Sequence, residues 1–495
     1  MLGLVAVEIA LMLTISSEGV KSRFEIAYAT YLGGSGWDEA REVIPYPDGS
    51  VLIGAQSCSP DMPMVEGAFQ PCYAGDDPNL GHPGVYGGDC YLARISPDGS
   101  ELIAATYFGG SKQERNVYGM ELDRDGNVVI TSMTHSPDLP VTEGAFQARH
   151  GGGPGTIFVA KLSGDLKELL WCTYLGGSGD ESPRGGLALD EEDNVYIFGT
   201  TASPDFPTTD GAYQRRLNGP RDAFVAKLKA DGSELIWCTL FGGSSEDYML
   251  GGRLDREGNV YFVGHTTSPD LPITPGCAQP RHGGKHDAYA VKLSPDGGQV
   301  LYATYLGGSG NEFPEHRPAL LPDGSLLIPG VTASPDFPVT PGAYQRELRG
   351  KNDAFLTKLS ADGSRFLFST LLGGSGTEVC LMPTVSPSGT IFIVGTTSSP
   401  DLPVTPDAFQ PRFGGGESDG WIAELSPDGS RLLFCSYLGG SGRDMIRSIA
   451  FGLGGEIYLV GYTFSEDFPV TDGALQTRYG GGGDAFVVKL VPRGR

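Results

Sequence analysis

Short hydrophobic runs, separated by turn residues, follow one another along almost the whole chain. Between residues 184 and 243 the runs are "RGGLALD", "NVYIFGTT", "DAFVAKL" and "ELIWCTLFGG". They are rich in Val, Ile, Phe, Tyr and Thr, and turns elsewhere such as "DRDGN" and "SPDGS" contain Asp-Gly pairs that favour tight hairpins. Four antiparallel strands are therefore predicted in this unit, and no stretch within the repeats has a sustained helical period.

The four-strand unit is repeated seven times. A Gly-Gly pair marks each copy, with its first glycine at residues 33, 109, 176, 242, 307, 373 and 439. Four-stranded units at such a period are typical of propeller blades, and seven blades close into a ring that leaves only short sheet edges exposed. The predicted fold is an all-β, seven-bladed β-propeller of four-stranded antiparallel blades. The glycines are expected to permit a tight turn between blades.

The two ends of the chain predict how the ring closes. The seventh unit ends at Arg495 without a fourth strand, whereas "FEIAYATYL" at residues 24–32 matches "RLLFCSYLGG" of the sixth unit. The N-terminal strand is therefore predicted to complete the last blade, so that residues 23–495 form a single propeller domain.

Residues 1–22 form an apolar segment that has no place in seven blades. Its first basic residue is Lys21 and Glu8 interrupts the apolar run, so it is either a retained tail or an atypical secretion signal. The apolar part is also too short, with a charge inside it, to predict a firm membrane span.

Three recurring segments resemble a known repeat family. "TYLGGSG", "SPDFPVTPGAYQ" (334–345) and "DAFVAKL" (222–228) are similar to the repeats of the SBBP family, whose name stands for seven-bladed β-propeller. The resemblance extends from Phe24 to the C-terminus. It implies the propeller fold and an extracellular or cell-surface, mostly bacterial setting, and it implies no defined activity.

Charge narrows the class of partner. The chain has 60 acidic and 35 basic residues, a formal net charge of −25. A polyanion would be repelled by such a surface, so nucleic acid is not expected as a partner.

One acidic position recurs in every unit, five residues after the first glycine of the pair. Its seven members are Asp38, Glu114, Glu181, Asp247, Glu312, Glu378 and Asp444. They are expected at one rim of the central channel, where each blade leads into the next. Two interpretations remain open: the carboxylates accept hydrogen bonds that hold the blades together, or they bind a hard cation such as Ca²⁺. No other cofactor is predicted.

The face that carries this acid ring is also expected to carry the long loops between the second and third strands. Each loop has about 25 residues and begins with a motif such as "SPDFP", which favours an ordered turn. Long loops on a rigid scaffold are frequent binding elements. Near the channel, five residues of the inner strands are candidates for an asymmetric pocket or for plain solvated polarity: Arg41, Arg184, His316, Arg317 and Arg447.

Three of the eight cysteines lie in the first unit. Cys58 ends the predicted second strand and Cys90 begins the third, so these two are candidates for a disulfide, with Cys72 as a rival partner.

These features favour a non-catalytic extracellular or cell-surface scaffold or interaction protein. An apolar tail docked on a neighbouring subunit would give head-to-tail self-assembly into a ring, filament or tube, so the expected partners are further copies of the chain or a cell-surface glycan. The alternative is a polysaccharide-binding or polysaccharide-degrading enzyme that uses the channel-rim carboxylates as acid and base.

Overall fold

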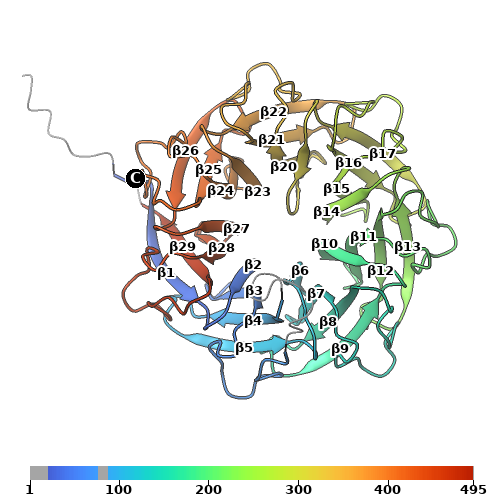
Figure 1. Cartoon of the computed structure of the whole chain (residues 1–495), viewed down its shortest axis with the longest axis horizontal. Helices are drawn as coiled ribbons and strands as arrows, with labels where there is room; N and C mark the ends of the chain where they lie inside the picture. Colours follow the sequence, from blue (N-terminus) through green and yellow to red (C-terminus); the bar gives the residue numbers. More distant parts are fainter. Residues whose placement is uncertain (1–20, 76–86, 494–495) are drawn as a thin grey trace, which may run out of the picture.

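Seven antiparallel sheets are arranged in a ring in the computed structural model, which describes residues 21–75 and 87–493 (Figure 1). No helix occurs in this described part, so no helix there is long and apolar enough to cross a membrane. The predicted seven-bladed β-propeller is confirmed. Residues 1–20 lie outside the described residues, and with them most of the predicted 1–22 segment.

The strands of each blade run outward from the centre of the ring in sequence order. Blades 1 and 2 consist of β2 (Asp38–Pro45), β3 (Val51–Ser57), β4 (Asp89–Ile95), β5 (Leu102–Phe108) and of β6 (Gly119–Leu122), β7 (Val128–Thr134), β8 (Thr156–Leu162), β9 (Leu169–Leu175). Blades 3 and 4 consist of β10 (Glu181–Leu189), β11 (Val195–Thr201), β12 (Asp222–Leu228), β13 (Leu235–Phe241) and of β14 (Asp247–Leu254), β15 (Val260–Thr266), β16 (Asp287–Leu293), β17 (Val300–Leu306).

Blade 5 differs because its inner strand is broken in two. It consists of β18 (Glu312–Pro314), β19 (Ala319–Leu320), β20 (Leu326–Thr332), β21 (Asp353–Leu359) and β22 (Phe366–Leu372). Blades 6 and 7 consist of β23 (Glu378–Val385), β24 (Ile391–Thr397), β25 (Asp419–Leu425), β26 (Leu432–Leu438) and of β27 (Asp444–Phe451), β28 (Ile457–Thr463), β29 (Asp484–Pro492), β1 (Phe24–Leu32).

The N-terminal strand closes the ring as predicted. β1 pairs antiparallel with β29, with Tyr31 opposite Phe486. The Arg493 backbone N–H also donates to the carbonyl oxygen of Arg23 at 3.0 Å, so the two described ends of the chain meet. Strands from both ends of the sequence thus complete one blade.

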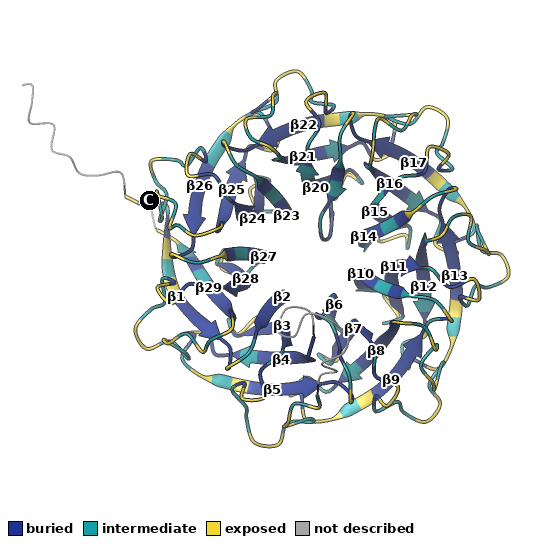
Figure 2. Cartoon of the chain, viewed as in Figure 1, coloured by how far each residue is buried: buried dark blue, intermediate teal, exposed yellow. Residues whose placement is uncertain are grey.

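The hydrophobic core lies between blades, because each sheet uses both faces to pack against its neighbours (Figure 2). At the interface of blades 1 and 2, Phe108 stacks on Phe158 with ring centroids 5.1 Å apart. At the closing interface, Tyr458 and Val460 of β28 share a cluster with Tyr91 of β4. Every blade therefore depends on the next for burial of its apolar residues.

The long loops leave the blades at the acid corners, as expected, where Gly36 N–H donates to the Ser59 hydroxyl at 2.8 Å, and they then lie against the outermost strands. In blade 2, Thr142 N–H donates to the Cys172 carbonyl at 3.2 Å, and Phe146 N–H donates to Gly232 O of blade 3 at 2.9 Å. The same bond to the next blade is made by the backbone N–H groups of Phe69, Tyr213, Ala278, Tyr344 and Leu475. The loops therefore cover strand edges that would otherwise stay unpaired, and they fasten neighbouring blades together.

Candidate functional site

The seven repeated carboxylates are fully buried at the corners where one blade leads into the next, with 0% of each residue exposed. Asp38 accepts hydrogen bonds from Gly34 N–H (2.8 Å) and from the hydroxyls of Ser57 (2.6 Å) and Ser59 (2.8 Å). Equivalent donors surround the other six, for example Gly110 N–H (2.9 Å) and the Thr134 hydroxyl (2.6 Å) at Glu114. Donors of the blade itself thus bind all seven carboxylates, as the hydrogen-bonding interpretation expects.

A second acid lies next to the first at six of the seven corners. The first glycine of the pair separates them: a Cβ on Gly109 would lie 2.5 Å from Asp89 Oδ1 and 2.4 Å from Glu114 Oε2. The other five pairs are Asp484 with Asp38, Asp222 with Asp247, Asp287 with Glu312, Asp353 with Glu378, and Asp419 with Asp444. At the remaining corner Thr156 takes the place of the second acid, opposite Glu181.

The corner glycines therefore serve a different purpose from the one predicted. Neither Gly109 nor Gly110 has a positive φ, so the turn itself does not require glycine there. What the corner requires is space, because any side chain on Gly109 would overlap two carboxylates. Close approach of buried groups, and not a tight turn, is the physical reason for the repeated Gly-Gly pair.

Burial shifts the protonation of the corners. Burial, reinforced by the neighbouring carboxylate of Asp89, raises the pKa of Glu114 to about 8. Burial likewise raises the pKa of Asp419 and Asp484 to about 7, with Asp444 and Asp38 as the respective acidic neighbours. These carboxyl groups therefore bind their protons more tightly than exposed carboxyl groups do. Among residues 21–75 and 87–493 no group of three or more Asp, Glu, His or Cys side chains is arranged to hold a metal ion.

The five inner-strand candidates lie near the axis of the ring, and three of them are buried. Arg41, His316 and Arg317 are 5%, 3% and 6% exposed, so plain solvated polarity is the wrong interpretation for them. Arg41 and Arg447 occupy β-bulges at the fourth residue of β2 and β27. A bulge leaves its extra residue outside the ladder and re-aims its side chain.

The segment that interrupts the inner strand of blade 5 lies in the centre of the ring. Pro314 ends β18 and Pro318 precedes β19, and between them His316 adopts a left-handed φ of 48°. The segment crosses toward blade 4, where a Cβ on Gly251 would lie 2.2 Å from the His316 carbonyl oxygen. Glycine at position 251 thus makes room for this unrepeated segment.

Arg317 uses this position to join three blades. Its guanidinium lies 3.3 Å from Glu42 of β2 and 3.1 Å from Glu121 of β6. Arg253 of β14 belongs to the same layer, since Arg317, Glu121 and Glu42 all influence its pKa, which burial lowers to about 10. This layer, made of Arg253, Arg317, Glu42 and Glu121, holds two positive and two negative side chains.

A second layer contains Arg41, Arg184, Arg447 and His316, which come from blades 1, 3, 7 and 5. Arg447 forms an ion pair with Glu39, and Arg184 lies 3.9 Å from Glu315. Arg41 stacks over the Tyr118 ring, with its guanidinium carbon 4.8 Å from the ring centroid. Burial, followed by the charges of Arg447 and Arg184, lowers the pKa of Arg41 to about 10. We call these four residues the axial cationic cluster.

Sequence reasoning did not single out the acidic partners Glu39, Glu42, Glu121 and Glu315. A signal was present, because each stands at an inner-strand position where the repeats differ from one another. The residues of the centre can thus be recognised as inner-strand positions at which the seven repeats differ.

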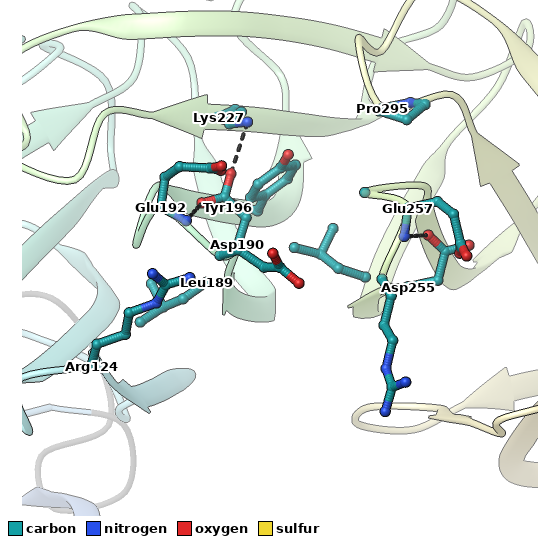
Figure 3. A pocket seen from close by; sticks show the side chains of 13 residues that line it. Arg124, Leu189, Asp190, Glu192, Tyr196, Lys227, Asp255, Glu257 and Pro295 are labelled. Carbon is teal, nitrogen blue, oxygen red and sulfur yellow. Dashed lines mark hydrogen bonds and ion pairs between the residues drawn. The ribbon is translucent and has the colours of Figure 1, made fainter.

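A polar depression on the hairpin side of blades 3 and 4 is a further candidate, with a volume of about 610 Å³ (Figure 3). Lys227 points from β12 toward Asp190 and lies 2.8 Å from it. The same pair recurs as Lys161 with Asp123 and as Lys292 with Asp255, so it is a feature of the blade and not of one site. The depression follows from the shape of neighbouring hairpins.

The predicted disulfide is not formed, and all eight cysteines are thiols in the structure. Cys90 pairs opposite Gln56 in the β3–β4 ladder, two residues away from Cys58. The Cys58 thiol instead donates to Gly87 O at 3.0 Å and the Cys90 thiol to Arg115 O at 3.2 Å, while Cys72 is exposed. The strand register therefore separates the two expected partners.

Comparison with known proteins gives distant structural matches. No protein-family model and no curated protein matches the chain. Among solved structures, a protein of unknown function from Dyadobacter fermentans is 11% identical, with a TM-score of 0.41 over 95% of this chain and 100% of its own.

Two further structures have printed activities. An ulvan lyase of polysaccharide lyase family PL25 is 10% identical, with a TM-score of 0.49 over 92% of this chain and 94% of its own. A quinohemoprotein alcohol dehydrogenase from Pseudomonas putida is 12% identical, with a TM-score of 0.42 over 97% of this chain and 79% of its own. At such low identities and TM-scores, these likenesses say nothing of what this chain binds or catalyses.

Proposed function

We propose that this protein is a non-catalytic extracellular or cell-surface scaffold that presents a rigid ring to its partners. The proposal rests on one observation: the repeated polar groups are already bonded to other groups of the ring. The seven corner carboxylates are occupied by Gly, Ser and Thr donors of the blades, and the long loops are bound to outer strands and to the next blade. These groups stabilise the ring, which is what a scaffold requires.

The enzyme alternative is less well supported by the same geometry. Acid–base cleavage of a glycosidic bond needs two carboxyl groups that flank the bond and touch the sugar. The corner carboxylates are 0% exposed, and a sugar would reach them only if the hydrogen bonds of the corner were broken. We therefore assign these side chains to stability.

Further copies of the chain and cell-surface glycans are the proposed partners. A large aliphatic side chain is exposed at the same position of five outermost strands, which suits contact between discs: Ile103, Leu170, Ile236, Leu301 and Leu367. The extracellular or cell-surface location follows from the resemblance of the repeats to the SBBP family.

Electron microscopy and a polysaccharide assay together test this proposal. Purified full-length protein is expected to form ordered oligomers or to be retained by polysaccharide-coated beads, without releasing new reducing ends. Monodisperse single discs that bind none of the polysaccharides would contradict the scaffold function. Release of reducing ends that is lost in Glu312→Gln but not in Glu191→Gln, an exposed acid, would favour the enzyme instead.

A further inference from the structure

We propose that the axial cationic cluster, Arg41, Arg184, Arg447 and His316, binds a small organic acid through a single carboxylate. The site would lie near the axis of the ring, because its members come from the inner segments of four different blades, and these segments surround the centre (Figure 1). Nothing in this inference depends on the scaffold function.

The charges around the cluster do not balance. Arg447 is paired with Glu39 and Arg184 with Glu315, whereas Arg41 has no ion-pair partner among the residues that the structure describes. The neighbouring layer of Arg253, Arg317, Glu42 and Glu121 is balanced by itself. The two layers and their acidic partners thus hold five arginines and four glutamates, so one positive charge is in excess at the centre, in a chain whose formal net charge is −25.

Two buried nitrogen atoms of the cluster also lack a partner. Arg41 Nε and His316 Nε2 are buried, and neither has a hydrogen-bond partner within residues 21–75 and 87–493. Arg41 is 5% and His316 3% exposed, so bulk water satisfies them poorly. A buried polar group left unsatisfied is unfavourable, and more so when it is charged, so such groups mark sites that a ligand completes.

The chemistry of these donors selects a carboxylate. A guanidinium presents N–H groups in a planar fork that matches the two oxygens of a carboxylate. The Tyr118 ring under Arg41 holds the plane of this fork. His316 adds an N–H donor in the tautomer that carries its proton on Nε2. A single negative charge cancels the surplus of the cluster, whereas a dianion would leave an uncompensated negative charge.

Arg184 is the member of the cluster that is most exposed to solvent. Its side chain is 44% exposed, that of its partner Glu315 is 22% exposed, and the pair is long, at 3.9 Å. A small acid suits the cluster better than a polymer does, because Arg41 and His316 are almost completely buried.

Isothermal titration calorimetry on the full chain tests the site, in a buffer of low chloride content. Acetate and D-glucuronate are the carboxylate probes, acetamide is the neutral control, and inorganic phosphate tests the class of anion. We expect binding of at least one carboxylate, no binding of acetamide, and weaker binding of phosphate. Acetate and glucuronate also distinguish a free small acid from an acidic sugar as the source of the carboxylate.

Matched variants locate the site. Arg41→Gln is expected to weaken carboxylate binding at least tenfold, and Arg41→Lys, which keeps the charge but loses the fork, by a smaller factor. Arg94→Gln is the control, because Arg94 is also in blade 1 and also stacks on a tyrosine, Tyr46, at 4.0 Å, but outside the cluster. Arg94→Gln should bind as the wild type does.

Several outcomes would overturn the proposal. These are the absence of binding by both carboxylates at millimolar concentration, tighter binding of phosphate, or equal losses in Arg41→Gln and Arg94→Gln. If Arg41→Gln fails to fold, Arg41→Lys decides the question, since unchanged affinity in a folded Arg41→Lys would exclude the bidentate contact. Scaffold behaviour is measured separately, by microscopy and polysaccharide retention, so either proposal can fail alone.

Discussion

The corners and the centre of this propeller are built on the same inner strands, yet their buried polar groups differ in whether they are hydrogen-bonded. At the start of β2, Asp38 accepts hydrogen bonds from one backbone N–H and two hydroxyls. Three residues later, Arg41 is equally buried, and its Nε has no hydrogen-bond partner among the described residues. The first arrangement recurs in all seven blades, whereas Arg41 stands at a position that differs from blade to blade.

This difference separates what the fold needs from what the individual protein adds. A polar group that is repeated and satisfied in every blade contributes to assembly of the ring. A polar group that is buried, unrepeated and unsatisfied costs stability, and it persists only where something other than stability requires it. Corner and centre should therefore respond differently to substitution.

Both regions exist only in a closed ring, so opening the ring should have the largest effect. Deletion of residues 24–32 removes six buried residues of β1, among them Phe24, Tyr28 and Leu32, and leaves β29 as a bare edge. The loss of burial is of the order of the whole stability of an ordinary domain, about 5–15 kcal/mol. We expect no cooperative melting transition by calorimetry.

A circular permutant is the control for this deletion. The ends can be joined by a short linker, because Arg493 N–H already lies 3.0 Å from Arg23 O, and new ends can be opened at residues 294–299 between β16 and β17. This variant keeps every described strand and should melt cooperatively. Wild-type melting by the deletion variant would show that β1 does not close the ring.

The balanced layer of the centre should be the next most sensitive. Arg317→Met leaves Glu42 buried without its cation and is expected to cost about 3 kcal/mol at pH 8. The control is Arg493→Met, whose ion pair with Glu25 is exposed and worth less than about 1 kcal/mol. Urea denaturation measures both, and equal costs would mean that the central ion pairs are no more important than surface ones.

Removal of a corner carboxyl should cost somewhat less. Glu114→Ala leaves Gly110 N–H and the Thr134 hydroxyl buried without an acceptor, at an expected cost of about 2–3 kcal/mol. Glu191→Ala changes an exposed acid and should be within about 0.5 kcal/mol of the wild type. A neutral Glu114→Ala, by the same urea measurement, would remove the structural role assigned to the corners.

The corners also predict an unusual dependence on pH. The folded pKa of Glu114, about 8, lies above the value of about 4 expected for an unfolded glutamate, so the folded state binds more protons between these limits. The resulting stabilisation is complete below about pH 4 and is lost as the pH rises through 8. Exposed aspartates with lowered pKa values, such as Asp98, change the stability only at more acidic pH.

Unfolding free energies between pH 5 and pH 8 test this dependence. Stability should decrease with rising pH, by on the order of 1 kcal/mol per pH unit for each corner carboxyl that titrates. Glu114→Gln should reduce the slope, and Glu191→Gln should leave it unchanged. An increase of stability over this range would contradict the raised pKa values of the corners.

The blades could be predicted because the sequence contains seven copies of one unit, which can be compared with one another. Seven copies of one pattern fix the strands, their order and the closure by residues 24–32, and all three are confirmed. The direction of the long loops was not predictable in this way, since strand order places only their ends. Their path along the outer wall depends on individual bonds such as that from Phe146 N–H to Gly232 O.

The centre was located but not understood from the sequence. Arg41 and Arg447 were identified by their variation between repeats, but the direction of their side chains depends on bulges that alternation of hydrophobic residues does not reveal. His316 and Arg317 enter the centre because two prolines interrupt the inner strand of blade 5. This interruption lets Arg317 reach Glu42 of blade 1. The disulfide was wrong for a similar reason, because ladder register decides which residues face each other.

The smallest expected effect on stability is also the most informative about the centre. Arg41→Met removes a buried guanidinium that has no ion pair with any described residue, while its methylene groups are replaced by an apolar chain against Tyr118. The change should lie within about 1 kcal/mol of the wild type, or should stabilise the protein, because the desolvation cost of the charge disappears. Arg317→Met, in the same centre, should destabilise the protein by about 3 kcal/mol.

An equally large loss of stability in Arg41→Met would mean that Arg41 holds the blades together, and the contrast between corner and centre would then fail. A small loss of stability combined with a large loss of carboxylate binding is the result that only a binding residue produces.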